Sequence, residues 1–485
     1  MSKQLRVLMT GATGYVGGRL VPELLSRDIY VRCLVRTPAK ISVAPWRDSV
    51  DVVAGDVGGP LEAALADIDV AVYLVHGIGD GPDWAAKETA DAEHFRVACE
   101  AAGVGRIVYL GGMGDDSSDL SVHLRSRHAV GAVLAAGPIP VFELRAAVII
   151  GSGSASFEML RYLVEVLPVM VTPKWVRTKS QPIAISDVLH YMVQAITVKQ
   201  AAAGIYEIGG PDVVSYAELM GLYAEEAGLN KRRLIPIPVL TPRLSSHWVG
   251  IVTPVPASLA QPLIESLANE VIVHDKKATE AFGPPQRTLR EAIHLALGRS
   301  QSDNVPTRFS DADLQVFRAY VTDPRWAGGT ELTDRRERDS TASPQRVYEV
   351  ISGIGGAKGW YSGGWLWQLR GAIDRVWGGP GLRRGRRDPA VLHVGDFVDF
   401  WRVTEAEPAE KVVLHAEMRL PGDAWLEWEI APTSSGSHVI QRARYKPRGL
   451  FGRIYWYGVL PFHLFIFPGM LKGIVNDAER TIKRP

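Results

Sequence analysis

The stretch Arg6-Val-Leu-Met-Thr10, which continues into Gly11-Ala-Thr-Gly14-Tyr-Val-Gly17-Gly18, decides the fold of the first half of the chain. It predicts a short apolar strand that turns through glycines into a helix. Gly11 permits the tight turn, Gly14 lets the backbone approach a pyrophosphate, and Gly17 lets the helix pack closely on the strand. Backbone N–H groups at the start of such a helix face an anion. Although a glycine turn can serve packing alone, its place directly after a strand predicts a dinucleotide-phosphate cradle.

Composition limits the class of protein. The chain has 485 residues, of which 46% are apolar, so two or three domains with large cores are expected. A net charge of +1 argues against a general nucleic-acid partner. Cys33 and Cys99 are the only cysteines, which excludes a disulfide framework and a thiolate zinc site, and no metal site is expected. We expect no signal peptide, because a strand begins so early, and a cytoplasmic location.

The pattern of the sequence changes near residue 300. Before it, apolar runs such as 70–75 and 106–110 alternate with helical patterns, which predicts an α/β, doubly wound parallel sheet over residues 1–298. Residues 299–328 are predicted to be a linker, because 299–312 is polar and has no period. Beyond it, nine of the 13 tryptophans fall between residues 326 and 456, and alternating stretches indicate antiparallel strands in a second domain, 329–485.

Charged residues at the ends of the next strands bear on the choice of nucleotide. The predicted second strand, 30–35, ends in Arg36, where an NAD-selective fold would place an acidic residue. A guanidinium there suits a 2′-phosphate and favours NADP over NAD, although Arg32 or Lys40 could play the same part and Arg36 could be a solvated cation. Asp56, after the third strand, is expected at the adenine edge or as a turn cap.

These features together resemble the atypical, extended branch of the short-chain dehydrogenase/reductase superfamily, which includes NmrA-like proteins. The resemblance covers about residues 4–295 and rests on the glycine turn, Leu-Val-Arg36, Gly55-Asp56, Tyr73-Leu-Val-His76-Gly and Gln181-Pro-Ile-Ala-Ile-Ser-Asp187-Val. It implies a Rossmann-type fold. Residues 143–154 are similar to the segment that lines the nicotinamide and substrate, with Ala146 in place of the usual proline. The cofactor contacts it implies are Gly11, Thr13, Gly14, Tyr15, Val16, Gly17, Arg36, Asp56, Val57, Leu74, Val75, His76 and Arg127.

The catalytic positions depart from that family. Its enzymes carry a tyrosine, a lysine four residues later and a serine on the preceding strand end; here His123, Arg127 and the Gly111-Gly112 pair stand in those places. Histidine can transfer protons near neutral pH, and Arg127 could hold the nicotinamide ribose as a fixed cation. His76 ends an apolar strand at the sheet edge where ligands bind. His123, Arg127 and His76 are therefore the catalytic candidates. The alternatives are that His123, like His128, is a polar residue on a partly exposed helix, and that His76 only makes a peptide-like hydrogen bond.

The last third of the chain predicts a strand near 333–341, a helix from Ser343-Pro, a second apolar helix over 359–377, and strands near 394–405, 411–420, 424–431 and 437–446 before a long apolar segment. This order resembles the START-like, helix-grip (SRPBCC) superfamily over roughly 329–483, an α+β fold. The resemblance implies a cavity for an apolar small molecule or lipid, with a solid aromatic core as the alternative. The whole chain resembles a bacterial family of NAD(P)-binding reductase-like proteins with an uncharacterised C-terminal domain.

Two segments raise the question of a membrane. Residues 454–471 are 18 residues long without a formal charge, close to the minimum for a span, but two prolines and His463 favour a kinked grip helix. The Arg383-Arg384-Gly-Arg386-Arg387 cluster could meet phosphate head groups or form a solvated turn. Peripheral membrane contact therefore stays open beside a cytoplasmic location.

The sequence as a whole indicates an NADP-dependent oxidoreductase or epimerase-like enzyme that acts on an apolar substrate held by the C-terminal domain. The alternative is a non-catalytic NADP-sensing regulator, lipid-binding carrier or scaffold, which the missing tyrosine, lysine and serine favour. The substrate and the oligomeric state are left undetermined by the sequence.

Overall fold

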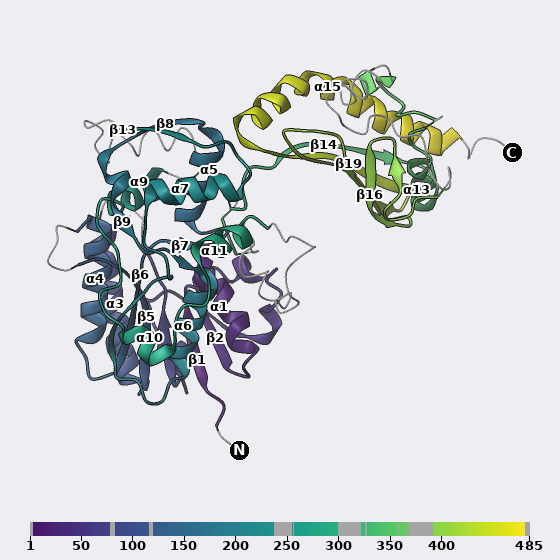
Figure 1. Ribbon diagram of the computed structural model, residues 1–485. Coiled ribbons are helices and arrows are strands. Elements are labelled where there is room, and N and C mark those ends of the chain that lie inside the picture. Colours follow the sequence, from purple (N-terminus) through teal and green to yellow (C-terminus); the bar gives the residue numbers. More distant parts are fainter. Residues whose placement is uncertain are drawn as a thin grey trace. The chain divides into compact units, whose positions relative to one another are not determined.

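The computed structural model describes residues 3–77, 83–115, 120–236, 255, 257–298, 322–324, 327–356, 358–364, 366–367 and 391–480. The chain forms two compact units, Met1–Gly329 and Thr330–Pro485 (Figure 1). The sequence places the second domain from residue 329, one residue from this division.

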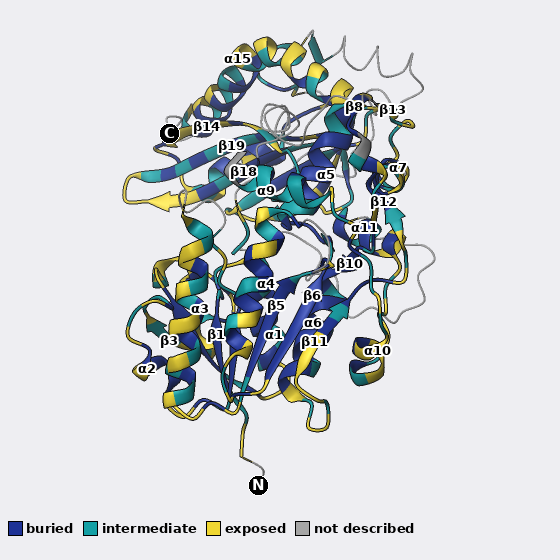
Figure 2. Ribbon diagram, turned by 90° about the vertical axis from the view of Figure 1, so that its left-hand side faces the viewer, coloured by how far each residue is buried: buried dark blue, intermediate teal, exposed yellow. Residues whose placement is uncertain are grey.

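The first unit is built on a seven-stranded parallel sheet in the order β11-β6-β5-β4-β1-β2-β3. Its strands are mostly buried (dark blue in Figure 2), as expected when helices cover both faces. The strand order reverses between β1 and β4, so a crevice is expected there at the carboxyl ends of the strands. The bounds are β1 (Arg6–Thr10), β2 (Tyr30–Val35), β3 (Asp51–Ala54), β4 (Val70–Tyr73), β5 (Arg106–Gly112), β6 (Val141–Ala146) and β11 (Gly204–Ile208).

Helices cover both faces of this sheet (Figure 1). Val7 and Met9 of β1 join one core cluster with α1 and α6, while Leu8 joins another with α3 and α4, because successive strand residues point to opposite faces. The prediction of a doubly wound α/β domain is confirmed. The helices are α1 (Tyr15–Leu25), α2 (Glu62–Leu65), α3 (Trp84–Ala101), α4 (Val122–Ala135), α5 (Ala155–Val166), α6 (Ile185–Thr197), α7 (Tyr216–Glu226), α9 (Ala257–Ser266), α10 (Lys277–Phe282) and α11 (Leu289–Ala296).

Short strand pairs complete the first unit. They are β7 (Ile149–Ile150) with β10 (Ile183–Ala184), β9 (Lys179–Ser180) with β12 (Val214–Ser215), and β8 (Val169–Thr172) with β13 (Arg233–Pro236).

The described end of the predicted linker is anchored in the first unit. The guanidinium of Arg19, on α1, meets the carboxylate of Asp323 in two contacts, Nη1–Oδ1 at 2.6 Å and Nη2–Oδ2 at 2.7 Å. Both side chains are only 1% exposed. The backbone N–H of Gly328 also donates to Glu158. The described residues of the predicted linker, 322–324 and 327–328, therefore belong to the first unit, and the rest of it lies outside the described residues.

The second unit contains a six-stranded antiparallel sheet in the order β14-β19-β18-β17-β16-β15. Ser343 caps helix α13 by accepting the N–H of Arg346, and proline opens the helix as predicted. An antiparallel sheet with helices confirms the α+β class. The bounds are β14 (Leu332–Ser340), α13 (Pro344–Ser352), β15 (Phe397–Val398), β16 (Trp401–Glu407), β17 (Lys411–Ala416), β18 (Gly422–Thr433), β19 (Gly436–Pro447) and α15 (Gly449–Arg480).

The long helix α15 packs on this sheet. Met470 and Ile474 of α15 join Leu426 and Trp428 of β18 in one buried cluster. Among the described residues, α15 is the one helix that is long and apolar enough to cross a membrane by length and composition. Its most apolar window of 18 residues has a mean hydropathy of 1.5. Core helices of soluble proteins also pass this test. One third of its apolar window is buried. Most of the predicted helix over 359–377, and the basic cluster 383–387, lie outside the described residues.

Candidate cofactor cleft and acid–base site

The turn between β1 and α1 leaves no room for a side chain at Gly11 or Gly17. Gly11 has φ +70°, and a Cβ there would lie 2.7 Å from the carbonyl oxygen of Leu74. A Cβ on Gly17 would lie 2.3 Å from the carbonyl oxygen of Gly11. Helix α1 starts after Gly14 without a side-chain cap and without an acidic residue in its first turn. Its N-terminal amides are therefore suited to bind an anion, and the glycines fit a pyrophosphate.

A cleft of about 200 Å³ lies at the carboxyl ends of the strands beside this turn. It brings together most of the predicted cofactor contacts, and it adds Thr10, which accepts the N–H of Leu74 and donates to the carbonyl of Val72. The lining residues are Thr10, Gly11, Thr13, Gly14, Leu34, Val35, Arg36, Thr37, Lys40, Gly55, Asp56, Val57, Leu74, Val75 and His76.

Two cations line the cleft at the end of β2. Arg36 and Lys40 are both exposed there, whereas Arg32 forms an ion pair with Asp51 and donates to three backbone carbonyls outside the cleft. Arg32 is therefore committed elsewhere. Asp56 accepts the N–H of Val57 at 2.8 Å and also lines the cleft, so it holds its own turn at the edge of the cleft.

Four predicted contacts do not line the cleft. Val16 and Gly17 lie on the first turn of α1, and the hydroxyl of Tyr15 is buried, which raises its pKa. Arg127 is also buried, and its guanidinium donates to the carbonyls of Val75 and Leu110. Arg127 therefore ties the ends of β4 and β5 together.

His76, at the end of β4, is held by a buried carboxylate. Its Nδ1 lies 2.6 Å from Oε1 of Glu88 on α3, and the same oxygen accepts the N–H of Gly77. Ser126 on α4 donates its hydroxyl to Oε2 at 2.6 Å. Burial alone raises the pKa of Glu88, but the hydrogen bonds from His76, Gly77 and Ser126 and the charge of His76 outweigh it and lower the pKa to about 2. Glu88 is therefore ionised at neutral pH and orients His76.

His123 lies beside His76 but in a different environment. The two ring centroids are 5.1 Å apart in an edge-on arrangement. Nδ1 of His123 is buried and has no hydrogen-bond partner among the described residues. Burial first, and then the charges of His76 and Arg127, lower the pKa of His123 to about 3. At neutral pH His123 is therefore uncharged and a weak base. Within the described residues, no cluster of three metal-ligating side chains occurs.

Sequence reasoning missed Glu88 and Ser126. A signal for Glu88 exists, because Glu88, Ala92, Phe95 and Cys99 follow the i, i+4, i+7, i+11 spacing of one helix face and all four are buried. A carboxylate on an otherwise apolar face requires a partner. Ser126 carries no such signal, since serine is common on any helix surface.

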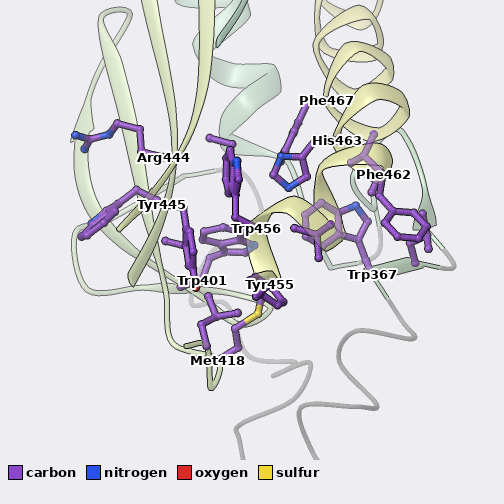
Figure 3. A pocket seen from close by; sticks show the side chains of 18 residues that line it. Trp367, Trp401, Met418, Arg444, Tyr445, Tyr455, Trp456, Phe462, His463 and Phe467 are labelled. Atoms are coloured by element: carbon purple, nitrogen blue, oxygen red, sulfur yellow. The ribbon is translucent and has the colours of Figure 1, made fainter. Parts of the chain in front are cut away.

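The second unit encloses an apolar pocket of about 250 Å³ between its sheet and α15 (Figure 3). Most of the labelled side chains come from these two elements, with Trp401 and Tyr445 on strands and Trp456 and Phe467 on α15. His463 lines the pocket beside these rings, and burial lowers its pKa to about 4, so it is uncharged at neutral pH. Most of the lining therefore offers apolar contact rather than charge, the exception being Arg444.

Two segments of the chain match known protein families. Residues 11–139 match a family described as NAD(P)H-binding, and residues 326–470 match a family described as a protein of unknown function. Comparison with curated proteins gives no match. The first unit is an NAD(P)-binding, Rossmann-type domain, whereas the second has no functional assignment.

Solved structures are similar to the first unit. Triphenylmethane reductase from Citrobacter sp. is 19% identical with a TM-score of 0.50, and the match covers 61% of this chain and 100% of that one. An NADPH-dependent quinone oxidoreductase from Escherichia coli is 20% identical with a TM-score of 0.47, over 60% and 98% of the two chains. A nucleoside-diphosphate-sugar epimerase from Staphylococcus aureus is 16% identical with a TM-score of 0.47, over 60% and 100%. At 19% identity the likeness to triphenylmethane reductase shows the fold alone.

Proposed function

We propose that the protein is an NADP-dependent oxidoreductase in which His76 transfers the proton that accompanies hydride transfer. The observation that carries this proposal is the chain from Ser126 through Glu88 to His76, whose histidine lines the same cleft as the glycine turn. An oriented imidazole beside an anion site at the carboxyl edge of a parallel sheet is a suitable acid/base for reactions at a dinucleotide.

The cleft suits NADP in particular. The N-terminal amides of α1 would hold the pyrophosphate, and Arg36 and Lys40 would contact the 2′-phosphate. The nicotinamide, when bound, supplies or accepts the hydride.

Side chains of the protein would bind and transfer the proton. Ionised Glu88 accepts the Nδ1–H of His76 and stabilises the imidazolium that forms when Nε2, the other ring nitrogen, takes a proton from the substrate. His123 fills the adjoining space as a neutral ring, and Arg127 positions the strand ends. Of the three histidine and arginine candidates, only His76 then acts as acid/base.

The substrate is proposed to be an apolar small molecule or lipid. The aromatic pocket of the second unit supports this class, because its lining offers area and few charges. The helix-grip resemblance supports the same class. Cys33 and Cys99 are free and buried, which fits the reducing cytoplasm proposed for the protein.

Native mass spectrometry of the gently purified protein should first identify the bound nucleotide and apolar compound. NADPH consumption is then measured with that compound, or with a panel of quinones and apolar carbonyl compounds. His76→Asn should lower kcat by roughly a hundredfold, and His123→Asn by less than about threefold. Gly14→Asp places a carboxylate against the pyrophosphate and should bind no nucleotide, so it is the negative control. The assignment fails if His76→Asn turns over normally.

A non-catalytic NADP sensor is the second candidate, favoured by Gly111, Gly112 and His123 at the places where family enzymes carry serine and tyrosine. It predicts NADPH binding without turnover of any compound. It also predicts that NADPH changes the affinity of the second unit for its ligand, and that Gly14→Asp removes this change. Constant ligand affinity with and without NADPH would eliminate it.

A further inference from the structure

The first half of α15 exposes large apolar side chains on one side. Seven residues, which we call the α15 outer face, are at least one third exposed, and Phe451 and Phe465 reach 78% and 75%. At 3.6 residues per turn they fall on one side of the helix, while Trp456 and Met470 on the other side are buried against the sheet. Exposed residues recur along α15 in Figure 2. The face consists of Leu450, Phe451, Ile454, Tyr457, Phe462, Leu464 and Phe465.

This face is too large and too aromatic for an ordinary soluble surface. From residue 450 to residue 465 the helix rises by about 22 Å. Single exposed apolar residues are common, but a contiguous patch of this length marks a binding surface. Phenylalanine and tyrosine are also the residues that interfacial helices place at the boundary between head groups and acyl chains.

The charges that α15 and the residues just before it contribute near the face are of one sign, and one carboxylate from β18, Asp423, lies 3.8 Å from Arg448. No aspartate or glutamate occurs from residue 449 to residue 476, whereas Lys446 and Arg448 are exposed just before the helix. Two copies of the chain paired through this face would bring cations together without a carboxylate from α15 to offset them. An anionic lipid surface complements both the cations and the apolar side chains.

The face also borders the apolar pocket. Phe462 belongs to both, because it is 47% exposed and lines the pocket. Tyr455 and Val459 line the pocket from the same stretch of helix. A surface that covers the outer face would therefore lie next to the pocket's lining.

We propose that the α15 outer face docks the second unit onto a lipid bilayer, with α15 lying in the interface, so that apolar molecules dissolved in the acyl region can reach the pocket. A spanning orientation is disfavoured, because the opposite side of α15 holds the core of the sheet together. The proposal goes beyond the proposed function, since docking requires neither the cofactor nor turnover.

Vesicle flotation of the full chain tests the proposal, with phosphatidylcholine vesicles that contain or lack phosphatidylglycerol. The protein should float with the anionic vesicles, less so at high salt, and equally with and without NADPH. The double variant Phe451→Ser, Phe465→Ser should bind about tenfold more weakly or worse. Both residues are exposed, so folding should survive, which circular dichroism checks. Val394→Ser, which removes a 66% exposed side chain of the same unit outside the face, should float like the wild type.

Three outcomes would overturn the docking proposal. The protein could fail to float with either vesicle, or the double variant could float as well as the wild type. Analytical ultracentrifugation could instead show a dimer that the double variant abolishes, which would assign the face to a second copy of the chain. None of these outcomes bears on NADPH consumption, so the docking and the proposed reaction fail or survive separately.

Discussion

The cleft of the first unit and the pocket of the second differ in the atoms that line them. The cleft is formed by backbone amides of the glycine turn together with Arg36 and Lys40, whereas the pocket is formed chiefly by aromatic rings such as Trp401 and Trp456. The cleft offers backbone N–H groups and two cations, whereas the pocket offers an apolar volume lined by side chains from several strands and a helix. A single substitution in the glycine turn should therefore abolish binding in the cleft, whereas a single substitution in the pocket should only weaken binding there.

Histidines beside the two cavities sharpen the contrast. Burial lowers the pKa of His123 to about 3 and that of His463 to about 4, so neither ring is charged at neutral pH. His76 has a buried, ionised carboxylate on its Nδ1 instead. Burial without a hydrogen-bonded carboxylate makes a histidine a neutral lining group, whereas an ionised carboxylate on Nδ1 can stabilise an imidazolium.

The largest effect is expected at Asp323, the residue of the predicted linker that forms a buried ion pair with the first unit. Asp323→Asn leaves the guanidinium of Arg19 buried without its counter-charge, which should lower the free energy of unfolding of the first unit by about 3 kcal/mol. The second unit has its own core cluster and should not change. Urea denaturation, monitored by hydrogen-exchange mass spectrometry, measures the free energy of unfolding of each unit separately.

A surface pair is the control for this prediction. Asp275→Asn removes an ion pair with Lys277 in which both side chains are well exposed, so its effect should stay within about 0.5 kcal/mol. If Asp323→Asn destabilised both units equally, the view of two separately stabilised cores would be wrong.

A smaller effect is expected from Glu88→Gln, which keeps the shape of the side chain but removes the charge that orients His76. The value of kcat should fall by roughly 10- to 100-fold, as for other residues that orient a functional histidine. Glu93→Gln, on the exposed side of the same helix, should leave kcat unchanged.

Glu88 should also change how the free energy of unfolding depends on pH in the acid range. Its pKa in the folded chain is lowered from an ordinary 4.5 to about 2, so the ionised carboxylate stabilises the fold above pH 4.5, and this contribution is lost as the pH falls toward 2. Glu88→Gln should flatten the pH dependence of stability in that window, measured by urea denaturation at several pH values. An unchanged slope would mean that Glu88 is not held by the contacts described.

Local patterns made much of this molecule predictable. The glycine turn, the apolar strands β1 and β4 and the capped start of α13 depend on neighbours within a few residues, and the structure confirms them. Contacts between distant segments were not predictable. Asp323 lies 304 positions from Arg19 in the sequence, and Ser126 lies 38 positions from Glu88. No short-range periodicity in the sequence indicates either contact. Arg127 was expected at the cofactor, but its guanidinium binds backbone carbonyls whose direction only the fold fixes.

The smallest predicted effect concerns the choice between the two dinucleotides. Arg36→Ala should weaken NADPH binding about tenfold, or about 1.4 kcal/mol, because one charge-assisted contact to the 2′-phosphate is lost while Lys40 remains. NADH, which has no such phosphate, should bind as before, so the ratio of the two dissociation constants measured by calorimetry is an internal control. Raising the salt concentration should reduce the wild-type preference and leave the variant almost unaffected. An equal loss of NADPH and NADH affinity would place Arg36 on the pyrophosphate or on the fold of the β2 end, and would remove the basis for preferring NADP.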